Sequence, residues 1–284
     1  MRAAICCIAK NENNYIREWV EYHIQLGFSK IFIFDNNDLW GEIFDDLLDD
    51  HIHSGKVQVI NCRGTFNFQL NAYNDCYQRF GNDFDWIAFF DVDEFLTFPS
   101  DSLYKNIVEY LRFVEGKGFD LVHINWMCYG DNNIVDYNTN HVLKRFIRPL
   151  DLNKKIDYDF PENNHIKSIV KGGLGVVNYD SVHTPLSDKF NVCDGDGEKL
   201  QDNTPFCPYT FKTIYLRHFV TKTISEYIQK AKKGRSDGYY AYPVNRFFLY
   251  NEKTPQKELI VNQYLDSLKS FDSTRYFDIS DPDI

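Results

Sequence analysis

The first ninety residues alternate short apolar runs with stretches in which hydrophobic side chains recur every three or four positions. Residues 3–9 form the first apolar run, and residues 15–24 follow at helical spacing, with Asn13 placed to cap that helix and Gly27 to end it. The predicted elements that follow are a strand over 30–34, a helix over 43–52, a strand over 56–60, a helix over 68–80 and a strand ending near residue 90. Such alternation is typical of a mostly parallel sheet covered by helices, so we expect an α/β fold.

Beyond residue 100 the pattern becomes less regular. A helix over 103–114 precedes a strand over 119–126. The later predictions are β-like runs over 142–147, 165–170, 176–182 and 213–220, and helices over 224–231, 239–249 and 257–271. We expect the acidic end, residues 278–284, to be frayed.

The fourth predicted strand ends abruptly in three carboxylates, Asp91, Asp93 and Glu94. Ligands of open α/β sheets bind just beyond such strand ends. In an extended segment Asp91 and Asp93 would point to one side, and two such charges repel unless a cation lies between them. Hard divalent cations prefer carboxylate oxygen, so the pattern favours Mg²⁺ or Mn²⁺ carrying a phosphorylated ligand. The ordinary alternative is a solvated turn or helix cap.

Polar residues also follow the other three early strands. The segment 10–12 follows the first strand, 35–38 the second and Arg63 the third. In a parallel sheet these ends share one edge with residues 91–94. Amide, carboxylate and guanidinium groups would then lie beside the pair of carboxylates that could bind a metal. This combination suits a nucleoside diphosphate, whose base and ribose would contact the polar groups while the metal binds the pyrophosphate.

Composition argues against several classes of protein, including nucleic-acid-binding, secreted and membrane proteins. The 284 residues carry a formal net charge of −10, and the one short basic patch is at 230–235, so we do not expect nucleic acid as a main partner. The N-terminal apolar stretch is too short for a signal peptide, and no stretch approaches a membrane span, so we expect a soluble, cytosolic protein. The seven cysteines lack a Cys-X-X-Cys pair, which favours buried free thiols over zinc or disulfides.

Several of these segments, taken in order, resemble the GT-A glycosyltransferases, particularly bacterial family 2-like enzymes and family 92 galactosyltransferases. The matching segments are 9–12, 18–23, 26–27, 34–37, 86–96, 165–170, 182–185 and 218–223. The resemblance implies a GT-A fold, Rossmann-like, with a mostly parallel sheet, flanking helices, a small mixed acceptor region and C-terminal helices. It divides the chain into a glycosyltransferase domain over 1–235, with a nucleotide-binding half (1–126) and an acceptor side (127–235), and a helical extension and tail over 236–284.

The resemblance also implies roles for single residues. Asp93 would bind the metal directly and Asp91 the metal or the ribose, while His218 would complete the metal shell. The residues facing the nucleotide would be Asn11, Glu12 and Asp35, with Lys222 or Arg63 neutralising phosphate. Each has an ordinary alternative: His218 as a structural histidine, Lys222 as a solvated residue and Arg63 as a plain salt-bridge partner.

The catalytic base is less well defined. An inverting transfer needs a carboxylate near the acceptor hydroxyl. The Gly-Glu-Asp cluster usual in family 2 is absent in that form, and Asp131 occupies the corresponding stretch; the other candidates are Asp180, Asp188 and Glu162. Glu94 would position the acceptor or cap the next segment. His183 would shape the acceptor side, hydrogen-bond the backbone or take the metal role of His218.

Together these inferences predict a Mn²⁺- or Mg²⁺-dependent, inverting glycosyltransferase. It would move a sugar from a nucleotide-sugar donor, UDP-galactose by analogy, to a glycan or lipid-linked glycan in surface polysaccharide or lipopolysaccharide synthesis. We expect it in the cytoplasm or at the inner face of the membrane. Ordinary core packing is expected for the aromatic residues of the last helices, and docking to a membrane surface or to a second subunit is the alternative; these residues are Tyr239, Tyr240, Tyr242, Phe247 and Phe248. The alternatives are a haloacid dehalogenase-like phosphatase, which shares Asp-X-Asp, and a non-catalytic sugar-nucleotide or glycan-binding module.

Overall fold

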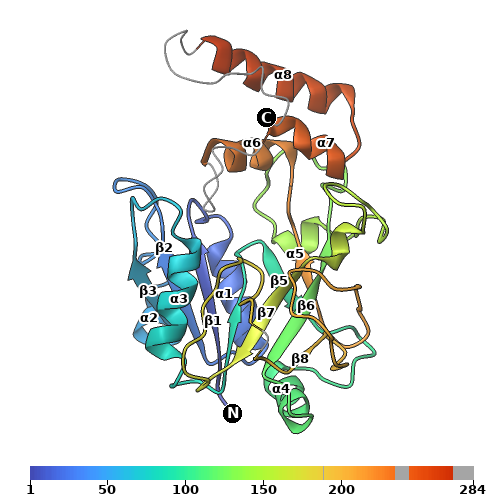
Figure 1. The fold of residues 1–284 in the computed structure, drawn as a ribbon. Helices are drawn as coiled ribbons and strands as arrows, with labels where there is room; N and C mark the ends of the chain where they lie inside the picture. Colours follow the sequence, from blue (N-terminus) through green and yellow to red (C-terminus); the bar gives the residue numbers. More distant parts are fainter. Residues whose placement is uncertain (188, 234–242, 271–284) are drawn as a thin grey trace. The chain divides into compact units, whose positions relative to one another are not determined.

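The computed structural model describes residues 1–187, 189–233 and 243–270. These form two compact units (Figure 1). Among the described residues, the first unit comprises 1–128, 151–187 and 189–218, and the second comprises 129–150, 219–233 and 243–270. The predicted domain boundary at residue 235 lies outside the described residues.

A nine-stranded sheet forms the centre of the first unit, in the order β3-β2-β1-β4-β7-β6-β9-β5, with β8 beside β6. The strands are β1 (Ala3–Ala9), β2 (Lys30–Asp35), β3 (Val57–Asn61), β4 (Trp86–Phe89), β5 (Glu94–Thr97), β6 (Leu121–Cys128), β7 (Ile166–Lys171), β8 (Val192–Cys193) and β9 (Tyr215–His218). Five of the eight strand pairings are parallel, including all three among β1 to β4. The expected α/β class with a mostly parallel sheet is confirmed.

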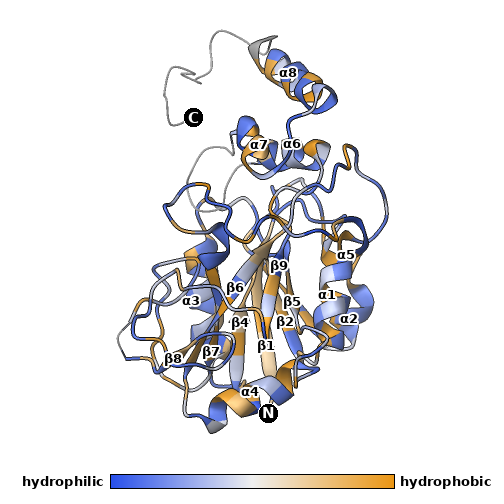
Figure 2. Cartoon of the chain, turned by 90° about the vertical axis from the view of Figure 1, so that its right-hand side faces the viewer, coloured by the Kyte–Doolittle hydropathy of each residue, from blue (hydrophilic) through white to orange (hydrophobic). Residues whose placement is uncertain are grey.

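The central strands are apolar because both of their faces are covered. Every residue of β1 and β4 is buried, and Figure 2 shows these strands in the white-to-orange part of the hydropathy scale. This is the composition expected of parallel strands packed between helices. One core cluster, for example, packs Phe32 and Phe34 of β2 against Tyr73 and Cys76 of a flanking helix.

The helices of the first unit are α1 (Ile16–Gln25), α2 (Asp49–His53), α3 (Gln69–Phe80), α4 (Ile107–Gly116) and the 3-10 turn η1 (Glu162–Asn164). Helix α1 buries Ile16, Trp19, Val20 and His23, the face that its sequence spacing predicts. Gly27 follows its last turn with a φ of +100°, as a helix-ending glycine should. The predicted Asn13 cap is wrong, because Tyr15 precedes the helix and makes no side-chain cap bond.

Three predicted elements differ in the structure. The helix expected over 43–52 is confined to α2, and the β-like run at 142–147 is the short helix α5 (Val142–Arg145). The run at 176–182 is not a strand, because the backbone of Tyr179 exchanges two hydrogen bonds with the Asn74 side chain, at 2.6 and 3.0 Å. The strands expected near 165–170 and 213–220 are confirmed as β7 and β9.

The second unit is helical. Besides α5 it contains α6 (Ile224–Lys233), η2 (Val244–Arg246), α7 (Phe247–Tyr250) and α8 (Pro255–Ser270), so the helices expected near 224–231 and 257–271 are confirmed. Its core includes Ile224, Tyr227, Phe247 and Val261, so Phe247 packs internally. Tyr239, Tyr240 and Tyr242 and the tail at 278–284 lie outside the described residues.

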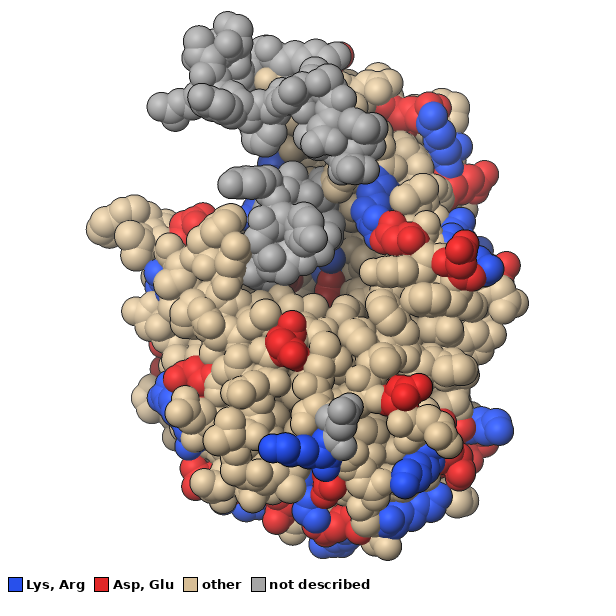
Figure 3. Space-filling model, viewed as in Figure 1, with Lys and Arg blue, Asp and Glu red and all other residues tan. Residues whose placement is uncertain are grey.

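Three global expectations can be checked directly. All seven cysteines are buried and free, as predicted. On the face shown in Figure 3, Lys and Arg side chains are interspersed with Asp and Glu, without a broad basic patch. Within the part of the chain that the structure describes, no helix has the length and apolar character needed to cross a membrane.

Candidate functional site at the carboxyl edge of the sheet

The carboxyl ends of β1, β2 and β3 bring their polar residues into direct contact. Lys10 pairs with Asp38 at 2.8 Å, and Arg63 pairs with Asp35 at 2.8 Å. The backbone N–H of Asn11, a residue with a φ of +53°, donates to Asn37 Oδ1 at 2.7 Å. The predicted convergence of these strand ends on one edge is therefore confirmed.

The acidic segment after β4 is a tight turn. Strand β4 ends at Phe89, the N–H of Glu94 donates to the carbonyl of Asp91 at 3.0 Å, and β5 then begins at Glu94. The expectation that Asp91 and Asp93 lie on one side of an extended segment is wrong. The turn instead gives the two carboxylates different neighbours.

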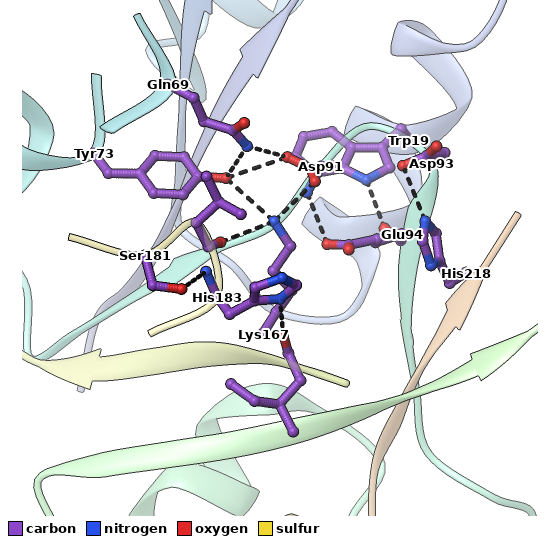
Figure 4. Close-up of polar contacts among 12 residues, drawn as sticks. Trp19, Gln69, Tyr73, Asp91, Asp93, Glu94, Lys167, Ser181, His183 and His218 are labelled. Carbon is purple, nitrogen blue, oxygen red and sulfur yellow. Dashed lines mark hydrogen bonds and ion pairs between the residues drawn. The ribbon is translucent and has the colours of Figure 1, made fainter. Parts of the chain in front are cut away.

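Asp91 is held by three donors (Figure 4). Its Oδ2 accepts from Lys167 Nζ at 2.8 Å, and its Oδ1 accepts from Gln69 Nε2 at 3.0 Å and Tyr73 Oη at 3.2 Å. The Lys167 side chain is 1% exposed, whereas that of Asp91 is 33% exposed. Burial alone would lower the pKa of Lys167, but the carboxylates of Asp91 and Glu94 outweigh it and the pKa is raised. The charge that balances Asp91 thus comes from the protein itself.

Asp93 lies beside His218, with Oδ1 and Nε2 separated by 3.8 Å. The two meet because Glu94 of β5 is paired with His218 of the antiparallel strand β9. Their side chains are 13% and 9% exposed, so both are mostly buried. The pairing of Asp93 with a late histidine is the arrangement that the family resemblance implies.

Glu94 is buried, with an exposure of 0%. Its Oε2 accepts from the backbone N–H of Asp91 at 2.8 Å, and its carbonyl accepts from Trp19 Nε1 at 2.7 Å. Burial raises the pKa of Glu94 well above its ordinary range, against the opposing effect of Lys167. Glu94 therefore stabilises the turn through its hydrogen bond to the backbone of Asp91. Because its side chain is fully buried, it is not positioned to contact an acceptor.

His183 lies beside Lys167 (Figure 4). Its Nδ1 is 2.9 Å from the carbonyl of Ile166, so Nδ1 carries the proton, and its backbone N–H donates to Ser181 Oγ at 3.2 Å. Burial, followed by the nearby Lys167 charge, lowers the pKa of His183 to about 3. The imidazole is therefore neutral at pH 7.

A pocket of about 580 Å³ opens beyond the ends of β2 and β3. Its polar lining includes Asp35, Asn61 and Arg63, and its apolar lining includes Leu39 and the 98% exposed Trp40. The Arg63 guanidinium also donates to the carbonyls of Asp38, Gly41 and Glu42. Arg63 is therefore a salt-bridge partner of Asp35, which was the ordinary alternative to a phosphate-binding role. Its bonds to the three carbonyls also hold the loop that forms the pocket wall. The backbone carbonyl of Glu12 accepts from the N–H of Ile16 at the start of α1.

Two predicted site residues, Asp131 and Lys222, belong to the second unit. Asp131 is buried there, accepts the N–H of Asn133 and pairs with Lys257 at 2.5 Å. Lys222 is also buried and has a φ of +53°. Of the remaining candidate bases, Asp180 is exposed and accepts the N–H of Leu186, Glu162 is buried, and Asp188 lies outside the described residues.

The residues around Asp91 were missed by the sequence analysis. Lys167, Gln69 and Tyr73 come from two elements, β7 and α3, that are far apart in sequence. The sequence does offer one indication of this contact, because Lys167 lies inside an otherwise apolar strand. A lysine in such a position is rarely buried without an acidic partner. Within the described residues, no group of three or more His, Cys, Asp or Glu side chains is arranged to hold a metal ion.

The chain is similar to known glycosyltransferases. The model of the family described as Glycosyltransferase family 92 matches residues 3–188. Galactan beta-1,4-galactosyltransferase GALS3 of Arabidopsis thaliana is 31% identical over 249 residues, covering 77% of this chain and 49% of the relative. A glycosyltransferase family 92 protein of Oryza sativa is 26% identical over 116 residues, covering 37% of this chain and 18% of the relative. The chain spans at most about half the length of either relative.

Among solved structures, S. aureus TarS matches with a TM-score of 0.43 and 11% identity, covering 96% of this chain and 44% of TarS. A shorter form of TarS, solved in complex with UDP-GlcNAc, matches with a TM-score of 0.42 and 11% identity, covering 97% of this chain and 74% of that one.

Proposed function

The chain belongs to glycosyltransferase family 92, and from this premise we propose that it transfers a sugar from a nucleoside diphosphate donor to a glycan acceptor. The relative with the longest alignment described above is named a galactan galactosyltransferase, which supports UDP-galactose as donor and a β-1,4-linked galactan as acceptor. The phosphatase alternative does not hold, because the family match includes the acidic turn and that turn follows the fourth strand.

The observation that carries the proposal is the pairing of Asp93 with His218 next to the Asp91–Lys167 ion pair. Both pairs lie at the carboxyl edge of the sheet, where ligands of α/β folds bind. The pocket beside Asp35 lies at the ends of β2 and β3, two to three strands away from β4. At about 4.8 Å per strand this is roughly 10 to 15 Å, a span suited to a nucleotide that reaches from its base to its diphosphate.

We propose that Asp93 and His218 hold a divalent cation together with the diphosphate. Two protein ligands suffice in such sites, because Mg²⁺ and similar ions are commonly bound by one or two carboxylates plus substrate phosphates. The imidazole nitrogen favours Mn²⁺ over Mg²⁺. The ion would supply positive charge where the departing diphosphate becomes more negative. Asp91, already neutralised by Lys167, remains partly exposed and is suited to accept hydrogen bonds from ribose hydroxyls.

An inverting transfer also needs a carboxylate base within hydrogen-bond reach of the acceptor hydroxyl. Glu94 is buried beneath the turn and Asp131 is paired with Lys257. Asp180 is exposed, and it lies two residues before Val182, whose carbonyl accepts from Lys167. We therefore favour Asp180 as the base.

The proposal is tested by incubating the protein with UDP-galactose, a β-1,4-galactan oligosaccharide and Mn²⁺, and following UDP release and glycan mass. The expected result is a glycan lengthened by one hexose, with slow UDP release in the absence of glycan. Binding of UDP-galactose without any turnover would instead identify a non-catalytic sugar-nucleotide module. Synthesis of a surface polysaccharide at the inner face of the membrane remains a prediction.

A further inference from the structure

Three imidazoles surround the indole of Trp126 in the first unit. The ring centroids of His218, His165 and His183 lie 4.1, 4.9 and 5.4 Å from that of Trp126. Strand register explains two of these contacts. Trp126 is paired with Leu216 of β9, so His218, two residues further on, lies on the same face. The backbone N–H of Trp126 also donates to the backbone carbonyl of His165.

The indole N–H of Trp126 has no hydrogen-bond partner among the described residues. The Nε1 atom itself is buried, although the residue as a whole is 9% exposed, so the donor is withdrawn from water. Leaving a buried donor unpaired destabilises the fold, and native proteins rarely do so without a reason. An oxygen atom supplied by a ligand would satisfy it.

His183 offers the complementary atom. Its Nδ1–H is fixed on the carbonyl of Ile166, so the neutral ring leaves a lone pair on Nε2. Within the described residues Nδ1 makes the one hydrogen bond of this ring. The Lys167 ammonium beside it disfavours protonation of Nε2, so this atom stays an acceptor.

We propose that Trp126 and His183 bind one hydroxyl group of the acceptor sugar. The hydroxyl oxygen accepts from Trp126 Nε1–H, and the hydroxyl proton is donated to His183 Nε2. This pairing selects a hydroxyl, because a phosphate oxygen only accepts and an ammonium only donates. Its position also fits, since Trp126 adjoins the His218–Asp93 pair and His183 adjoins the Lys167–Asp91 pair. The choice of a glycan as ligand rests on the proposed function.

The fixed Nδ1–H and the lowered pKa of His183 together indicate that this residue orients the hydroxyl and does not remove its proton. A general base works best when its pKa is near the working pH, and that of His183 is lowered to about 3. The pH dependence of turnover should therefore survive the loss of this imidazole.

Nuclear magnetic resonance of the four tryptophan indole N–H groups tests the proposal without relying on turnover. The probe is β-1,4-linked galactotetraose added to the protein holding UDP, and the Trp126 signal is assigned by its loss in Trp126→Phe. We expect the glycan to shift the Trp126 signal and slow its exchange with water. A signal that does not respond while other resonances report glycan binding would mean that water alone satisfies the indole, and would overturn the proposal; so would a protein that does not bind the glycan.

Kinetics provide the second test. Trp126→Phe keeps the ring contacts and removes the N–H, so KM for the glycan should rise about 3- to 10-fold, a larger change than in KM for UDP-galactose. Trp86→Phe is the matched control, because Trp86 also has an unpartnered buried N–H but is 0% exposed in the core. Equal effects of the two variants on KM would overturn the proposal. Glycan binding at Trp126 in a protein without transfer would count against the proposed function alone.

Discussion

Asp91 and Lys167 form an ion pair whose partners differ greatly in burial, with side chains 33% and 1% exposed. Asp91→Asn leaves the buried ammonium uncompensated and should lower the free energy of unfolding by about 3 kcal/mol. Lys167→Met leaves a carboxylate that water can reach, and should cost about 1 kcal/mol. Urea denaturation of both variants measures the difference. Equal losses would show that the ammonium is not the buried partner.

Glu94 is predicted to make stability depend on pH. Its pKa is raised in the folded state, so its stabilising contribution is complete below the ordinary value of 4.5 and is lost as pH rises through the folded pKa. Glu94→Gln keeps an acceptor for the N–H of Asp91 and removes the titration. The Tm of this variant should therefore rise relative to that of the native protein as pH increases above 4.5. A difference in Tm that is constant with pH would contradict this.

Site residues could be predicted from the sequence where the evidence for them lies in neighbouring residues, and were missed where it depends on contacts distant in sequence. Asp91 and Asp93 stand out because they end an apolar run, and Asp35 and Arg63 because they follow neighbouring parallel strands. Lys167 was missed because its partner is 76 residues away and reaches it through the antiparallel strand β7. The opposite surroundings of Asp91 and Asp93 come from a turn that sequence spacing does not reveal.

At the scale of elements, Arg63 joins the end of β3 to the loop after β2. Its guanidinium bonds Asp35 and three backbone carbonyls of residues 38–42. Arg63→Lys keeps the charge but lacks the planar fork, so it should release the loop nearly as much as Arg63→Ala, at a cost of about 2 kcal/mol. Hydrogen exchange of residues 36–48 should rise in both variants and not in the exposed control Lys56→Ala. Unchanged hydrogen exchange in Arg63→Lys would show that the guanidinium does not hold this loop in place.

The elements whose hydrophobic pattern was strong were predicted well, and the others were not. Strands β1 to β4 and helix α1 follow directly from apolar runs and helical spacing. The run at 176–182 has a strand-like composition, but Asn74 occupies its backbone groups. Strand β5 has four residues and is defined by pairing with β9, more than a hundred residues later, so local pattern could not identify it.

At the scale of the whole molecule, three neutral histidines with lowered pKa values should make the fold sensitive to acid. Burial lowers the pKa of His23 and His183 to about 3 and that of His123 to about 4, from an ordinary value of 6.5. A lowered folded pKa gives stability that is complete above 6.5 and is lost as pH falls toward the folded value. Each histidine should remove up to about 1.4 kcal/mol per pH unit in this range.

Denaturant titrations at pH 7.5 and pH 5 measure this loss. His23→Gln is the informative variant, because the His23 ring bonds backbone groups through both nitrogens, at 2.8 and 3.3 Å. It should be less stable than the native protein at pH 7.5 but lose less stability on acidification. If both proteins lost the same amount of stability on acidification, His23 would not contribute to the acid sensitivity.

The most direct test of the central claim compares Asp93→Asn with the native protein in Mn²⁺-dependent turnover of UDP-galactose. Asp101→Asn, an exposed substitution elsewhere in the first unit, is the matched control. We expect Asp93→Asn to fold normally, to retain its Tm to within a few degrees and to lose at least a hundredfold in kcat at saturating Mn²⁺, while the control keeps native activity. Native turnover by Asp93→Asn would show that this carboxylate does not hold the cation.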